Sequence, residues 1–122
     1  MSERVPYLHV CITCRAGQAL EEGAVPPGQR LYEAVQGLAD SGRVLVKPIT
    51  CLASCERGCA AVISQPGRWG YLLGHLRSEL AGDLLAYAGA YAASKTGTVM
   101  PSKRPPSLSG VVLGRVPNVE VL

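Results

Sequence analysis

Five cysteines, all before residue 60, constrain this chain of 122 residues more than any other feature of its sequence. Cys11 and Cys14 form a C-x2-C pair, Cys51 and Cys55 form a C-x3-C pair, and Cys59 repeats the second spacing. In a reducing compartment disulfides are disfavoured, and clustered cysteines there usually serve metal or redox chemistry. The spacing therefore predicts that a part of this chain is built around thiolates.

Composition and charge exclude several classes of function. The net charge is only +3 and the basic residues are scattered, so the dense basic face of a nucleic-acid-binding protein is missing. Residues 1–7 lack the apolar segment of a signal peptide, and the weakly polar stretch at residues 80–93 is too short to span a bilayer. We expect a cytoplasmic protein with no nucleic-acid or membrane partner. Because the motifs of hydrolases and phosphate-binding loops are absent, we expect no enzyme.

The order of the predicted elements indicates an α/β fold. Apolar residues at spacings of four and three, Leu31, Val35 and Leu38, predict a first helix. The predicted strands cover residues 7–12, 43–49, 59–64 and 69–73, and a second helix covers residues 78–94. A strand–helix–strand unit favours a parallel crossover, and the following hairpin makes the sheet mixed. The sequence predicts a four-stranded mixed sheet with two main helices, the outline of a thioredoxin-like fold.

The chain changes character near residue 98. Residues 1–97 are predicted to form the domain, and residues 98–122 a proline-rich, irregular C-terminal extension. Within this extension, the apolar residues 111–113 either add a short strand or belong to a tail that lies across a neighbouring subunit. Pro48 predicts that its strand lies on an edge of the sheet or leaves it, because proline has no N–H for a central ladder.

The two cysteine pairs are predicted to meet at one edge of the sheet. They follow the first and second strands, and if these strands are neighbours their ends lie at the same edge. Four converging thiolates are favourable only around a multivalent cationic centre, such as an iron–sulfur cluster or structural zinc. A dithiol redox site would use Cys11 and Cys14 alone and leave three cysteines unexplained. The spacing thus favours a metal site and leaves iron–sulfur and zinc open.

Three segments resemble known families. Residues 51–59, CLASCERGC, look like the cysteine segment of thioredoxin-like [2Fe–2S] ferredoxins, and the proline–glycine turn before Trp69 is similar to their hairpin. Those proteins also place two cysteines after the first strand. More closely, CITCR, CLASCERGC and PGRWGYLLG resemble DUF1636, a family of predicted metal-binding proteins. The resemblance covers roughly residues 7 to 97.

The resemblance implies a thioredoxin-like fold and a [2Fe–2S] cluster held by Cys11, Cys14, Cys51 and Cys55. It implies a one-electron carrier between redox partner proteins, a homodimer, and a link to cobalamin biosynthesis. The alternative is a zinc-binding structural or interaction module, or a metal carrier. In two respects this sequence departs from the ferredoxin pattern: its first cysteine pair is more closely spaced, and Cys59 stands where those proteins have proline.

The remaining candidate residues near the site have two interpretations each. Cys59 is either a small buried residue that opens the third strand, which is common for free cysteine, or a ligand in place of Cys14. His9 and His75 are potential iron ligands in principle, but we expect no such role where four cysteines are available. Trp69 and Tyr71 alternate with a glycine and are predicted to pack in the core.

Overall fold

The computed structural model describes residues 5–13, 23–39, 42–50, 59–65, 67–94, 99, 105–108 and 110–117. These residues form one five-stranded sheet with two α-helices and two short 3₁₀ helices, η3 and η5. The elements, in chain order, are β1 (Tyr7–Cys11), α1 (Pro27–Leu38), β2 (Leu45–Ile49), β3 (Ala61–Ser64), β4 (Gly70–Leu73), η3 (Ser78–Leu80), α2 (Ala81–Ala93), η5 (Pro106–Leu108) and β5 (Val112–Val116).

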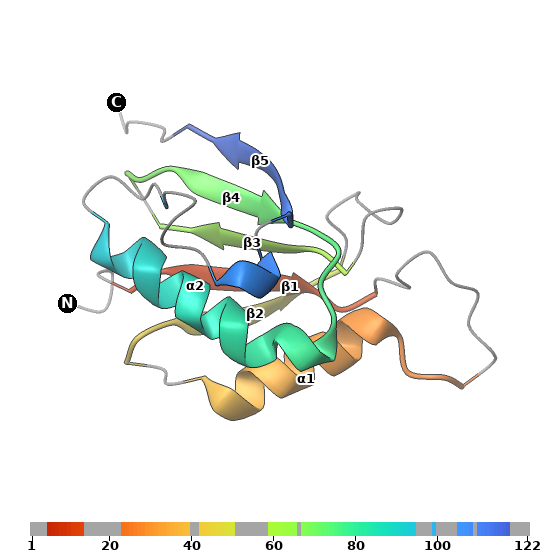
Figure 1. The fold of residues 1–122 in the computed structure, drawn as a ribbon. Coiled ribbons are helices and arrows are strands. Elements are labelled where there is room, and N and C mark those ends of the chain that lie inside the picture. The colour runs from red at the N-terminus through yellow and green to blue at the C-terminus, as the bar shows by residue number, and fades with distance from the viewer. Residues whose placement is uncertain are drawn as a thin grey trace.

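The sheet has the strand order β2-β1-β3-β4-β5 (Figure 1). Strand β1 is parallel to β2 and antiparallel to β3, and the remaining neighbours are antiparallel. The predicted mixed sheet with two main helices is therefore confirmed. Pro48 lies in β2, which is an edge strand, as its missing N–H predicts.

The prediction of four strands is wrong by one, because β5 pairs along β4. The pairing runs from Gly70 beside Val116 to Leu73 beside Val112, with a bulge between Leu72 and Leu73. Of the two interpretations of residues 111–113, the one that adds a strand is thus confirmed. The division of the chain between residues 97 and 98 stays a prediction.

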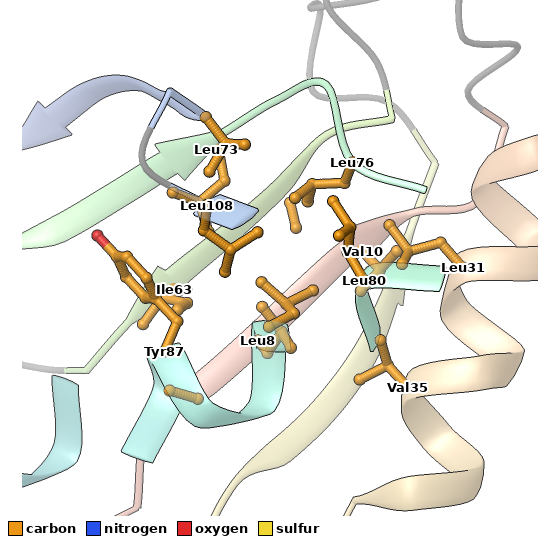
Figure 2. Packing of buried hydrophobic residues seen from close by; sticks show 14 of the residues in the cluster. Leu8, Val10, Leu31, Val35, Ile63, Leu73, Leu76, Leu80, Tyr87 and Leu108 are labelled. Carbon is orange, nitrogen blue, oxygen red and sulfur yellow. The ribbon is translucent and has the colours of Figure 1, made fainter. Parts of the chain in front are cut away.

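The core lies between one face of the sheet and the two helices (Figure 1). Strand alternation directs Leu8 and Val10 of β1 toward the helices, and both side chains are fully buried. Figure 2 shows Leu31 and Val35 of α1 close to Val10, while Leu108 of η5 lies with the strands. Helix, sheet and C-terminal segment thus share one apolar cluster.

The two helices begin differently. Helix α1 starts at Pro27, because proline at the first helical position forfeits no hydrogen bond. The predicted second helix is confirmed as η3 followed directly by α2, which ends at Ala93. Within the described ranges, no helix combines the length and apolar character needed to cross a membrane.

Tyrosines take the place that phenylalanine fills in many cores, since the sequence contains no Phe. Tyr71, Tyr87 and Tyr91 are almost fully buried, and the Tyr71 ring meets the other two edge to face at 5.8 and 6.4 Å between centroids. The prediction of core packing for Tyr71 is confirmed. Its hydroxyl accepts a hydrogen bond of 2.8 Å from the backbone N–H of Val99, and the Tyr91 hydroxyl donates to the carbonyl of Trp69.

We expect the stability of the protein to fall as the pH rises through and above about 10, the ordinary pKa of tyrosine. Burial raises the pKa of Tyr91, although Arg68, 4.9 Å above its ring, opposes the shift. A group whose pKa is raised by folding stabilises the native state fully below its unfolded pKa and loses this contribution at higher pH. Urea denaturation between pH 8 and 11 measures the effect. The Tyr91→Phe variant should lose less stability over this range, and an equal loss would contradict the assignment.

Candidate metal centre

Cys11 is the last residue of β1 and is held in place by the sheet on both sides. Its backbone N–H donates to the carbonyl of Ala60 at 3.0 Å, and the N–H of Ile12 donates to the carbonyl of Ile49 at 3.0 Å. The side chain is buried, with 4% of its surface exposed. A thiol at this position has a fixed backbone and little contact with solvent.

The Cys11 sulfur lies against the segment that leads to the second cysteine pair. Its Sγ is 3.6 Å from the carbonyl oxygen of Thr50 and 3.8 Å from Oγ1 of Thr13. The Thr13 hydroxyl also donates to the Thr50 carbonyl. In the sequence Thr50 directly precedes Cys51. The first cysteine of the first motif and the residue directly before the second motif are therefore in contact.

This contact follows from the parallel pairing of β1 with β2. Cys11 lies beside Ile49 in the register, so the chain leaves both strands at the same end of the sheet. In Figure 1 this end also receives the start of β3, which lies next to β1 on its other side. Residues 51–58 thus connect two points that both adjoin Cys11.

Cys59 lies two residues before β3 and is fully buried. Its backbone forms a reciprocal pair with Leu76: the N–H of Cys59 donates to the Leu76 carbonyl at 3.2 Å, and the N–H of Leu76 donates back at 3.1 Å. Because Ala61 and Ile63 are buried beneath the helices, strand alternation assigns Cys59 to the same, helix-covered face.

Cys11 belongs to the opposite face by the same reasoning. It follows the core residue Val10 and pairs with Ala60, so alternation assigns it to the face without the helices. The complete burial of Cys59 in the apolar cluster supports its interpretation as a buried core residue. Its role as a ligand stays a prediction that mutagenesis can test.

The other predicted ligands, Cys14, Cys51 and Cys55, lie outside the described residues. Of the predicted cysteine ligands, the structure places Cys11 alone, together with the alternative ligand Cys59. Among the residues that it describes, no three His, Cys, Asp or Glu side chains come together in a way that could hold a metal ion.

The two histidines lie apart from each other. His9 stacks on Tyr7, with ring centroids 6.1 Å apart and an angle of 11° between the planes. His75 is exposed and has a φ of 55°, in the left-handed region, one residue before Leu76. His75 therefore adjoins the cysteine end of the sheet, while His9 lies two residues back along β1.

The sequence did not predict that Thr13 and Thr50 contact the Cys11 sulfur. Threonine is frequent in strands and loops, and its hydroxyl carries no metal-ligand signal. The positions flanking the cysteines could have been suspected only from the pairing register, which brings the chain after Cys11 beside the chain after Ile49.

Comparison with solved structures places this architecture in the thioredoxin-like class. A thioredoxin-like [2Fe–2S] ferredoxin from Aquifex aeolicus superimposes with a TM-score of 0.54 at 13% identity, covering 91% of this chain and 92% of that one. A 1.5 Å crystal structure of the wild-type thioredoxin-like [2Fe–2S] ferredoxin from the same organism gives 0.54 at 17% identity, covering 90% and 97%. At these identities the likeness establishes the fold.

The sequence also identifies the family. Residues 8–118 match the profile of DUF1636, described as a protein of unknown function, and this chain belongs to that family. The curated proteins include no significant match. The predicted family membership and thioredoxin-like fold are thus both confirmed.

Proposed function

We propose that this protein is a one-electron carrier that holds a [2Fe–2S] cluster on Cys11, Cys14, Cys51 and Cys55. The observation that carries the proposal is the contact of 3.6 Å between the Cys11 sulfur and the carbonyl of Thr50, the residue before Cys51. It joins two cysteine motifs that are separated by 36 residues of sequence. The thioredoxin-like fold that this chain shares with [2Fe–2S] ferredoxins adds support.

The donor chemistry of the described part fits such a group. A cluster of this kind takes four thiolates and stores one electron, with a potential set by charge, hydrogen bonds and solvent exposure. Cys11 supplies a sulfur that is shielded from solvent and fixed by two neighbouring strands. A ligand with a fixed position needs little rearrangement when the cluster gains or loses its electron.

Thr13 is placed to act on this sulfur. When Cys11 is a thiolate it can only accept hydrogen bonds, and the Thr13 hydroxyl, 3.8 Å away, can turn its single proton from the Thr50 carbonyl toward this sulfur. A hydrogen bond to a ligating sulfur raises the reduction potential, because it stabilises the more negative state. Thr13 is therefore a positioning and tuning residue of the proposed centre.

Purification without oxygen tests the proposal. We expect a coloured protein with two iron atoms and two sulfides per chain, absorbing between about 400 and 600 nm and bleaching with dithionite. A colourless protein with one bound zinc would replace the proposal with the zinc-module alternative. Apoprotein that turns over in a thiol–disulfide exchange assay would favour the dithiol site instead.

The partners follow from this role and stay proposals. A one-electron carrier needs a protein that reduces it and a protein that it reduces, so we propose redox partner proteins and no substrate of its own. The homodimer expected from the family resemblance is part of the same proposal. Analytical ultracentrifugation of the protein with its cluster bound measures whether it is a homodimer.

A further inference from the structure

The face of the sheet opposite α1 and α2 carries side chains that no described helix covers (Figure 1). We call it the open face. Alternation assigns Tyr7 and His9 of β1 to it, as well as Val62 of β3 and Gly70 of β4. The same alternation assigns Cys11 to this face, two residues beyond His9 and therefore about 7 Å further along the strand.

A groove of about 560 Å³ crosses the open face from β1 to β5. This volume lies within the range of sites for small organic ligands. The lining is mainly apolar and aromatic, with a few polar groups at one end, which is the usual character of such sites. Its lining includes Tyr7, His9, Val62, Arg68, Gly70 and Val116.

Two features make the groove suited to a flat ring. The Tyr7 and His9 rings both line the groove and are nearly parallel, 11° apart with centroids at 6.1 Å, and we call this pair the Tyr7–His9 wall. Gly70 lines the groove without a side chain, and a Cβ there would come within 3.2 Å of the Ile63 carbonyl and 3.8 Å of the Val116 Cβ, so the strands pack too closely for a side chain and the groove stays open at this point.

The charge around the groove favours an anion. Lys47 lies beside His9 in the parallel register, on the same face and on the neighbouring strand, and it is exposed. No carboxylate is present among the described lining residues. The acidic residues that the structure describes all lie on the helical side, in α1, η3 and α2: Glu33, Glu79 and Asp83. Arg68 of the lining also keeps its positive charge, because its guanidinium donates to neutral acceptors, Gln65 and carbonyls at the end of α2.

We infer that the open-face groove binds a planar aromatic anion, with its ring on the Tyr7–His9 wall and its charge toward Lys47. A flavin mononucleotide has this chemistry: a flat heteroaromatic ring joined to a phosphate. This inference goes beyond electron carriage, since binding needs no cluster. The position of the groove on the face of Cys11 places such a ring next to the proposed centre.

Equilibrium dialysis of the full-length protein against flavin mononucleotide tests the inference, with flavin fluorescence read in the protein-free chamber. Val62→Trp fills the groove from the open face without touching the core and should weaken binding at least about tenfold. Val25→Trp, the same change at an exposed position before α1, is the matched control and should leave binding unchanged. Thermal melts confirm that both variants fold.

The anion requirement is tested separately. Lys47→Ala should weaken flavin mononucleotide about threefold, as expected for one exposed charge, and leave riboflavin, which lacks the phosphate, unaffected. If Val62→Trp misfolds, His9→Ala tests the wall instead and should weaken both ligands. The inference would be overturned if the protein bound neither ligand, or if Val62→Trp and Val25→Trp bound the ligand equally well. It would also be overturned if Val62→Trp changed the oligomeric mass of the protein and left the ligand affinity unchanged. Iron analysis of the same samples shows independently whether the cluster is present, so a failure of flavin binding can be distinguished from a failure of the cluster proposal.

Discussion

Replacing Cys11 with serine is expected to abolish the visible absorption of the protein and to remove nearly all of its bound iron. The serine hydroxyl is a far weaker ligand than a thiolate, because it does not ionise near neutral pH. At this position the side chain is buried at the end of β1, beside the segment that opens the second cysteine motif. Iron content per chain and the absorption spectrum after anaerobic purification measure the loss.

Cys59→Ala is the matched control for this variant. Cys59 is fully buried on the helix-covered face, so its replacement should lower stability by about 1 kcal/mol and leave the iron content unchanged. Cys14→Ser should behave like Cys11→Ser. If Cys14→Ser retained the cluster while Cys59→Ala lost it, the fourth ligand would be Cys59 and the assignment made from the sequence would be wrong.

Deleting residues 98–122 is expected to leave a chain that is largely unfolded at 25 °C. Among the residues that the structure describes, the deletion removes the buried side chains Val99, Leu108 and Val111 from the core, together with the pairing of β5 along β4. A fully buried aliphatic side chain contributes about 1.5 to 3 kcal/mol, so the loss is comparable with the whole stability of a small domain. Circular dichroism and urea denaturation measure the effect.

A shorter deletion, residues 118–122, serves as the control, since it removes none of the described contacts. It should keep the unfolding midpoint of the full chain. This pair of deletions also tests the predicted division between residues 97 and 98. A cooperative transition of residues 1–97 at the midpoint of the full chain would show that the first 97 residues suffice, and would contradict the energetic role assigned to Leu108 and β5.

The pattern of the sequence predicted the fold well wherever local signals agree. The apolar spacing of Leu31, Val35 and Leu38 gave the first helix, and Pro48 gave the edge strand. Strand β5 was harder to predict, because Val112 and Leu113 form a short run before Gly114, with prolines nearby. Its strand conformation depends on pairing with β4, and such non-local pairing outweighs local propensity.

For the candidate site, the edge of the sheet was predictable, while the set of cysteine ligands stays a prediction. The cysteine spacing and the β1–α1–β2 unit indicated that two motifs meet, and the register brings Cys11 and Thr50 together. The open-face groove was not predicted. The groove depends on which residues of β1, β3, β4 and β5 share a face of the sheet. The pairing register of the strands decides this, and the sequence positions of Tyr7, Gly70 and Val116 do not predict that register.

Quantitative electron paramagnetic resonance of the full-length protein, purified without oxygen and reduced with dithionite, tests the central claim most directly. The account predicts one unpaired electron for every two iron atoms, as in a singly reduced [2Fe–2S] cluster. A protein that is silent under these conditions and carries zinc, or iron without sulfide, would contradict it.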